Sequence, residues 1–283
     1  MLECWREVFM LFEKAQGLLN AEYETYYQDA TEHARKVMNE KKIHSYQVLG
    51  VGNYLLKHEA LFHNCSSAEL QKLKATLLLH DIGRFYEVFL HEDGGRVDHG
   101  VYGAKLLEQK SSFNDAEVIL PIRHHGHLIE RLWEDSDYSN LSENERRKIQ
   151  IIIYLVRDAD KIANFYLLSR HFKEMENLFF LKSLLDYQTK IPSPLVWEAF
   201  MKHSAVDVKN VKSFADQAIM YMACVFDLAY ESSFILLDKL NILQKLFDCF
   251  KKFWADDYAQ ICEYELWTYC EARLRGDKNF FDF

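Results

Sequence analysis

Apolar positions recur along most of the chain at the spacing of amphipathic helices. Polar breaks between these stretches predict helices over residues 1–19, 21–40, 43–62, 66–79, 98–108, 114–125, 142–172, 194–203, 208–231, 233–253 and 255–275. Three of the predicted helices begin with capping signals, which are Ser66 or Ser67, Asp98, and the pair Ser142 and Glu145. Residues 151–156 are almost continuously apolar, so we expect the helix that contains them to be buried.

Polar and proline-rich segments divide the chain. Residues 91–96 and 133–142 are expected to be loops, and Pro192 and Pro194 mark the clearest break. We therefore expect an N-terminal domain over residues 1–190, with its motifs within about 35–170, and a C-terminal helical extension over residues 191–283. The helices of the extension have faces too apolar to stand alone in water, which predicts that they pack on the first domain, with a separate domain as the alternative.

The composition favours an all-α protein. The 283 residues include only 10 Gly and 3 Pro, whereas a sheet needs such residues at each reversal of the chain. Lys and Arg number 34 against 43 Asp and Glu, and the net charge of −9 argues against a binder of nucleic acid or anionic membranes.

The sequence also predicts a cytoplasmic location. Charged residues interrupt the N-terminal apolar stretch, and no run of about 20 apolar residues occurs, so we expect neither a signal peptide nor a membrane span. The six cysteines lie far apart and form no CxxC pair, which is typical of thiols in a reducing compartment.

Histidine and aspartate residues provide the chemical signal of the sequence. They occur at predicted helix ends or on inner helix faces, as His44, His80, Asp81, His99, His124, His125, Asp158 and Asp160. Imidazole and carboxylate groups suit zinc, manganese and iron without any thiolate. One carboxylate can also bridge two cations, and such a pair activates water and binds phosphate oxygens. A lone His-Asp dipeptide is weak evidence, but the ordered set predicts a metal site.

Five segments carry these residues in a recognisable order. They are KIHSYQV at 42–48, LLLHDIGRF at 77–85, DHGVYGA at 98–104, IRHH at 122–125 and VRDADK at 156–161. The segments resemble the HD-domain metal-dependent phosphohydrolase superfamily, in particular its branch with an HDIGRF-type motif. The resemblance implies an HD-domain helical bundle that binds one or two divalent transition ions, with manganese, iron, zinc and nickel not distinguished.

The resemblance also implies which residues hold the metal. One cation would be bound by His44, His80, Asp81 and Asp160. A second would be bound by His99 with His124 or His125, and Asp81 would bridge the two. The motif Ile-Arg-X-His favours His125, although members with both histidines can use both. The Ala-Asp pair of the last motif selects Asp160, and Asp158 is then a solvent-facing or supporting residue.

Arg84 is a second candidate catalytic residue beside Asp81. It follows His80 by four residues, and its guanidinium could hold a phosphate oxygen. A salt bridge with Glu87 is an equally supported interpretation. The 5′-nucleotidase branch of the superfamily carries an acid at this position, so Arg84 argues against a plain deoxynucleotidase. Arg157 and Lys161, four residues apart, could line the mouth of the site.

The sequence therefore predicts hydrolysis of a phosphate ester or anhydride of a small, nucleotide-like molecule. Two alternatives stay open, a di-iron oxygenase that uses the same ligand set and a non-catalytic binding module stabilised by metal. The expected partner is a small phosphorylated substrate, with no nucleic acid and no membrane. The aromatic C-terminal helices are also compatible with a homo-oligomer.

Overall fold

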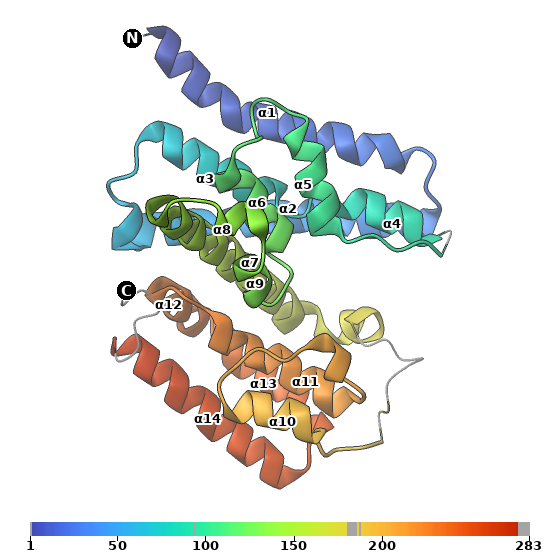
Figure 1. Ribbon diagram of the computed structural model, residues 1–283. Coiled ribbons are helices and arrows are strands. Elements are labelled where there is room, and N and C mark those ends of the chain that lie inside the picture. Colours follow the sequence, from blue (N-terminus) through green and yellow to red (C-terminus); the bar gives the residue numbers. More distant parts are fainter. Residues whose placement is uncertain (1, 93, 180–185, 187, 277–283) are drawn as a thin grey trace. The chain divides into compact units, whose positions relative to one another are not determined.

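The computed structural model describes residues 2–92, 94–179, 186 and 188–276, and these residues form helices joined by short loops (Figure 1). Within this part of the chain there is no strand, only an isolated bridge between Asp186 and Ser213. The all-α prediction is thus confirmed. None of the described helices is long and apolar enough to cross a membrane.

The chain divides into two compact units, residues 1–160 and 161–283. The first unit contains α1 (Leu2–Tyr27), α2 (Glu32–His58), η1 (Ala60–Phe62), α3 (Ser67–Leu79), α4 (Arg84–Glu92), α5 (His99–Glu108), α6 (Ala116–His124), α7 (Glu130–Trp133), α8 (Ser136–Ser139) and the first half of α9 (Glu143–Phe179). The second unit contains the rest of α9, then α10 (Pro194–Met201), η2 (Val208–Asn210), α11 (Phe214–Ala223), η3 (Cys224–Asp227), α12 (Glu231–Lys239), α13 (Ile242–Phe250), η4 (Lys251–Phe253) and α14 (Asp256–Leu274). Packing of the C-terminal helices on the first domain stays a prediction.

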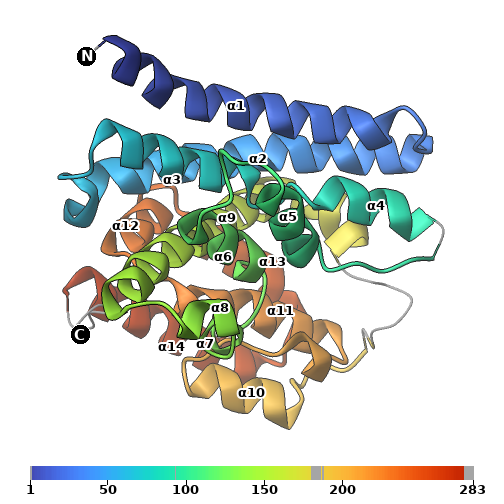
Figure 2. The same cartoon turned by 45° about the horizontal axis from the view of Figure 1, so that its top comes forward.

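Helix α3 is the central element of the first unit. It packs against α1, α2 and α6, and α1 lies alongside α2 in both views (Figures 1 and 2). The consecutive residues Leu77, Leu78 and Leu79 are all fully buried, because α3 is packed against three other helices, α1, α2 and α6. This apolar end places the next two residues, His80 and Asp81, inside the unit.

The predicted capping signals are confirmed at all three helix starts. Ser66 forms a capping box with Glu69, and the Asp98 side chain accepts a hydrogen bond from the Val101 N–H. At the start of α9, the Ser142 N–H donates to Glu145 Oε2 over 2.9 Å.

Several predicted boundaries are wrong because tertiary packing and capping override the polar breaks. The expected break near residue 20 lies instead before Thr31, whose side chain caps α2, and α2 continues through the expected break near residue 41. Residues 208–231 are not one helix, since Ser213 caps a new helix at Phe214. Asn241, with φ of 50°, separates α12 from α13 within the range expected to be one helix.

Candidate metal centre

Five elements bring the predicted ligands together inside the first unit. His44 lies in the middle of α2, His80 and Asp81 follow α3, and His99 is the first residue of α5. His125 caps the C-terminal end of α6, and Asp160 lies on α9. The site is therefore assembled from residues 116 positions apart in the sequence, as the contact between His44 and Asp160 shows.

The first group of ligand atoms comes from His44, His80, Asp81 and Asp160. The ligand atoms of the first three lie within 4.8 Å of one another. Asp160 Oδ1 lies 2.8 Å from His44 Nε2 and 3.7 Å from His80 Nε2. His80 Nε2 also lies 3.8 Å from Asp81 Oδ2. These atoms converge on one point, as ligands of a single cation do.

The second group shares Asp81 with the first. Asp81 Oδ1 lies 3.2 Å from His125 Nε2 and 3.3 Å from His99 Nε2, and the two imidazole nitrogens are 3.3 Å apart. The other oxygen of the same carboxylate, Oδ2, faces His80. Asp81 thus directs one oxygen to each group, which is the arrangement of a carboxylate that bridges two cations.

The hydrogen bonds of His80 and His125 indicate whether their rings can bind a metal. The Nδ1 atoms of His80 and His125 lie 2.9 Å from the Leu77 carbonyl and 2.8 Å from the Ile122 carbonyl. A carbonyl accepts only from N–H, so Nε2 of each ring carries the lone pair in the neutral state and faces Asp81. His80 Nε2 is fully buried and has no hydrogen-bond partner among the described residues, and a metal ion would supply one. The donor set fits a divalent cation.

The electrostatics of the site also suit a cation. Burial alone would raise the pKa of Asp81, but Arg84, His80 and His125 hold this pKa well below its usual value. Burial likewise opposes ionisation of Asp160, yet His44 and His80 hold its pKa well below the usual range. Burial lowers the pKa of His125 to about 4. At neutral pH both carboxylates are ionised and His125 is neutral, as metal binding requires.

The structure does not bring His124 into either group. His124 Nε2 lies 2.7 Å from Asp135 Oδ2, and His124 has no ligand atom in either group. Consecutive residues of a helix point in different directions, so only one member of the His124-His125 pair faces the site. Asp158 is fully buried and does not face solvent, which corrects one of the two roles expected for it. The half-buried His127 pairs with Asp98, Nε2 to Oδ2, over 2.6 Å.

The structure is compatible with both roles expected for Arg84, the salt bridge with Glu87 and the binding of a phosphate oxygen. Its NH1 lies 2.6 Å from Glu87 Oε2, so the salt bridge exists, and its Nε lies 3.2 Å from Asp81 Oδ1. Arg84 also lines a cavity of about 200 Å³ beside the second group, together with Glu87, Asp98, His99, Arg123 and His127. The guanidinium is thus within the same site as the ligands.

Three residues near the site were missed or misplaced by the sequence patterns. Lys41 lies one helical turn before His44, and electrostatic interactions link it to Arg84, Asp81 and Asp160. The sequence pattern offers Glu87 only as a salt-bridge partner of Arg84, yet its Oε2 also lies 3.5 Å from His99 Nδ1. Arg157 does not line the mouth of the site, because it is only 3% exposed. The i, i+3 spacing to His44 was the only available signal for Lys41.

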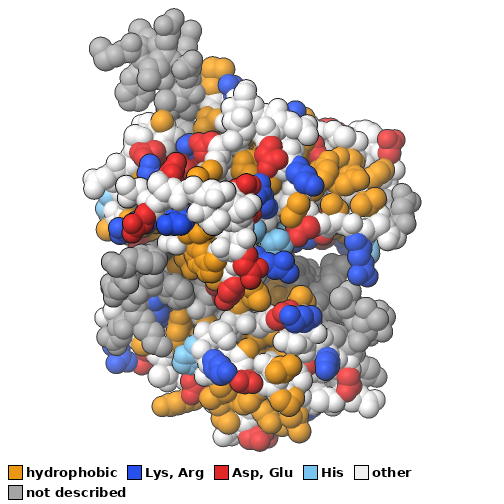
Figure 3. Space-filling model, in the orientation of Figure 1, with side chains coloured by type: hydrophobic (Ala, Val, Ile, Leu, Met, Phe, Trp, Pro, Cys, Tyr) orange, Lys and Arg blue, Asp and Glu red, His pale blue; other side chains and the backbone are white. Residues whose placement is uncertain are grey.

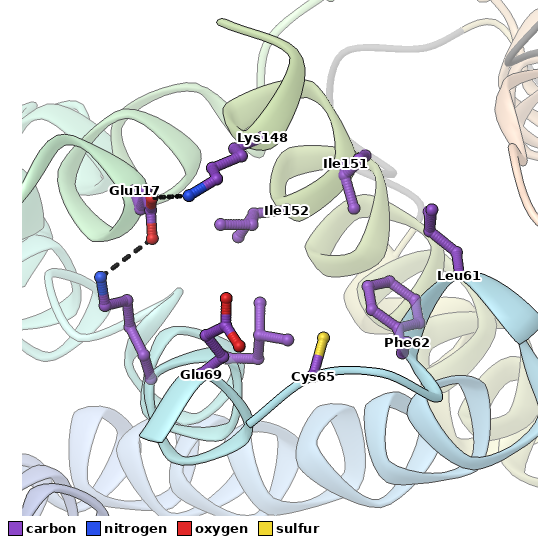
Figure 4. A pocket seen from close by; sticks show the side chains of 10 residues that line it. Leu61, Phe62, Cys65, Glu69, Glu117, Lys148, Ile151 and Ile152 are labelled. Carbon is purple, nitrogen blue, oxygen red and sulfur yellow. Dashed lines mark hydrogen bonds and ion pairs between the residues drawn. The ribbon is translucent and has the colours of Figure 1, made fainter. Parts of the chain in front are cut away.

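A second cavity, of about 130 Å³, contains none of the predicted ligands (Figure 4). Its walls are mainly apolar and come from Leu61, Phe62, Leu73, Ile151 and Ile152. The charged rim is internally paired, since Glu117 lies 2.9 Å from Lys72 Nζ and 3.7 Å from Lys148 Nζ. This cavity therefore lacks the converging histidines that give the other site its chemistry.

Fold and site together define an all-helical protein with buried His and Asp side chains arranged as metal ligands. Residues 42–164 match the family model described as HD domain, so this part of the chain is an HD domain. The HD-domain superfamily is of the metal-dependent hydrolase type, in agreement with the His and Asp groups of the structure. Neither the curated proteins nor the solved structures contain a match to the chain.

Proposed function

We propose that the protein is a metal-dependent phosphohydrolase that cleaves a phosphate ester or anhydride of a small, nucleotide-like molecule. The observation that carries the proposal is the Asp81 carboxylate, which directs its two oxygens to two different histidine groups beside a cavity lined by Arg84. One or two divalent cations bound there would lower the pKa of a water molecule and neutralise phosphate oxygens.

The residues around the cavity have separate roles in this proposal. Asp81 orients both histidine groups through its two oxygens, and the Leu77 and Ile122 carbonyls hold the rings of His80 and His125. Arg84 binds a phosphate oxygen, since a planar guanidinium matches two oxygens of a phosphate. The cavity that Arg84 lines is the position of the phosphate.

His127 belongs to neither ligand group but lines the cavity, and Asp98 Oδ2 accepts a hydrogen bond from its Nε2 over 2.6 Å. A carboxylate partner of this kind orients an imidazole. His127 is therefore a positioning residue at the wall of the cavity. His124, by contrast, is held by Asp135 and does not line the cavity.

Metal analysis and a substrate screen test the proposal together. Protein purified without chelator should contain one or two transition ions per chain, and with manganese or iron it should release phosphate from at least one small phosphate ester or anhydride. Asp81→Asn should lose both the metal and at least about 1000-fold in activity, a loss of about 4 kcal/mol of transition-state stabilisation. Asp29→Asn, at an exposed position, is the matched control.

Two results would contradict the proposal. The first is a metal-loaded protein that hydrolyses no phosphorylated compound while Asp81→Asn leaves the metal content unchanged. The second is iron-dependent oxygen consumption without phosphate release, which would support the oxygenase that uses the same kind of ligands.

A further inference from the structure

Arg84 binds the same carboxylate oxygen that the second histidine group faces. Its Nε lies 3.2 Å from Asp81 Oδ1, and His125 Nε2 and His99 Nε2 lie 3.2 Å and 3.3 Å from that oxygen. Oδ2 of the same carboxylate faces His80 in the first group. The positive charge of Arg84 is therefore directed at one of the two groups.

We infer that Arg84 and a cation in the second group compete for Asp81 Oδ1, and that phosphate relieves this competition by drawing Arg84 into the cavity. The inference rests on the proposed function and adds a form of regulation to the same site. It predicts that the two groups have unequal affinities for metal, with the second group filled in response to phosphate.

The competition follows from the distances. A metal ion bound to Asp81 Oδ1 would lie about 2.0–2.2 Å from that oxygen. Arg84 Nε lies 3.2 Å from the same oxygen. The guanidinium and the cation would therefore be close together in a site of reduced dielectric constant, where like charges repel strongly.

Glu87 provides the anchor that lets Arg84 leave Asp81 without losing every partner. A single oxygen of Glu87, Oε2, lies 2.6 Å from Arg84 NH1 and 3.5 Å from His99 Nδ1. Glu87 and Arg84 both line the cavity, as do Arg123 and His127. Arg84 can therefore exchange Asp81 for a phosphate oxygen while it keeps Glu87.

The exchange couples two ligands. Phosphate in the cavity gives the guanidinium a new partner, which frees Asp81 Oδ1 for a second cation. Because binding free energies are reciprocal, a second cation must in turn strengthen the binding of phosphate. The coupling passes through one side chain and requires no movement of a helix.

Titration with Mn²⁺, followed by electron paramagnetic resonance, tests the inference without any measurement of activity. Free Mn²⁺ is counted from its own signal, and a spin-coupled spectrum reports two ions that share Asp81. In apo protein without phosphate, Arg84→Gln should bind the second ion about tenfold more tightly than wild type, a change of about 1.4 kcal/mol. The first ion should bind within about threefold of wild type.

Matched variants distinguish the effect of the Arg84 charge on metal binding from a general disturbance of the site. Arg84→Lys keeps a positive charge and should stay near wild type, whereas Arg96→Gln removes an exposed arginine outside the cavity and should change nothing. Inorganic phosphate should strengthen binding of the second ion in wild type, and it should do so less in Arg84→Gln. Circular dichroism establishes that each variant is folded.

The outcomes distinguish this inference from the proposed function. If wild type binds two ions and Arg84→Gln binds the second no more tightly, the competition is wrong while the proposed function stands. One ion in wild type and two in Arg84→Gln would support the competition. One ion in both proteins would overturn it, and no bound ion in either would overturn the proposed function as well.

Discussion

At the scale of single residues, Arg157 shows how a buried charge can hold the backbone that carries a ligand. Its NH1 donates to the carbonyl of His125 over 3.0 Å and also to the carbonyl of His127. A guanidinium presents several donors in a fixed plane, so it can bind two carbonyl groups of one turn. Arg157 on α9 thereby fixes the turn that begins at His125.

Arg157→Lys should destabilise the protein even though it keeps the charge. The lysine side chain is shorter, so its ammonium group cannot bind both carbonyls. Leaving a buried hydrogen-bonding group without its partner lowers the free energy of unfolding by about 1–3 kcal/mol. The urea midpoint should fall, and binding of the second metal ion should weaken because His125 is less well held. Arg170→Lys, at an exposed position on the same helix, should leave both unchanged. Equal urea midpoints for Arg157→Lys and wild type would contradict this role.

The sequence motifs identify the ligand types but not every orientation. His80-Asp81 and the Ala-Asp pair at Asp160 stand out because their chemistry and order are unusual. His124 and His125 are chemically identical neighbours, and only the way α6 ends decides which ring faces Asp81. Arg157 gives no such signal, since the two carbonyls that it binds belong to His125 and His127, 32 and 30 positions earlier in the chain.

At the scale of helices, glycine allows α5 to approach the turn after α3. A Cβ atom on Gly83 would lie 2.2 Å from the backbone oxygen of His99, and one on Gly100 would lie 2.7 Å from the backbone oxygen of Arg123. Both neighbours are backbone atoms, so they cannot rotate away as a side chain could. These two contacts set the distances between the segments that carry Asp81, His99 and His125.

Gly83→Ala should therefore destabilise the first unit, by about 1–3 kcal/mol for a forced backbone shift. Gly50→Ala is the matched control, because a Cβ at this exposed position of α2 would meet nothing within 4 Å. It should stabilise the protein by about 0.5–1 kcal/mol, since alanine restricts the unfolded chain and favours a helix. Thermal unfolding of the two variants measures the difference. Similar unfolding temperatures for both would contradict the close approach.

The aromatic residues of α1, α4 and α5 surround a buried acid. The hydroxyls of Tyr26 and Tyr102 lie 2.8 Å apart, and Tyr86 stacks on Tyr102 with ring centres 4.4 Å apart. Hydrophobic side chains gather on the surface over α1 and α4 (Figure 3). Glu22 is buried on α1 and interacts with both Tyr26 and Tyr102. Burial raises the pKa of Glu22, although the two tyrosines partly offset this effect.

The raised pKa of Glu22 predicts a loss of stability at higher pH. The folded state keeps this proton to a higher pH than the unfolded state, whose ordinary value is 4.5. The stability from Glu22 is thus complete below pH 4.5 and is lost as the pH rises through the raised pKa. Glu22→Gln should melt at a higher temperature than wild type at pH 8, and the difference should shrink towards pH 4.5. Glu24→Gln, on the exposed side of α1, should show no such trend; a pH-independent difference for Glu22→Gln would contradict the argument.

The helices illustrate what local patterns can and cannot predict. The starts of α3, α5 and α9 were predictable because each cap lies within three residues of the group that it binds. Helix α4 is not predicted by the local pattern, because Gly83 directly before it has no side chain that could cap a helix. The uninterrupted course of α2 was also missed, since polar residues at 39–42 are compatible with a helix whose other faces are buried.

At the scale of the whole molecule, α9 belongs to both compact units. The unit boundary falls directly after Asp160, yet the helix continues from Glu143 to Phe179. Ile153 and Val156 are buried before the boundary, and Ile162, Phe165 and Leu168 are buried after it. The apolar run at 151–156 predicted a buried helix correctly, but no composition change marks the boundary inside it.

The continuity of α9 predicts that metal binding in the first unit protects part of the second. Backbone N–H groups just after Asp160 bond to carbonyls one turn earlier, and helix opening is cooperative over such turns. A metal that fixes Asp160 should therefore slow amide hydrogen exchange at residues 161–168 as well as in α3 and α6, while α13 and α14 should not change. Exchange followed by mass spectrometry, with and without chelator, measures each segment separately. Asp81→Asn should abolish the metal effect throughout, and protection that stops at Asp160 would show that the two halves of α9 open independently.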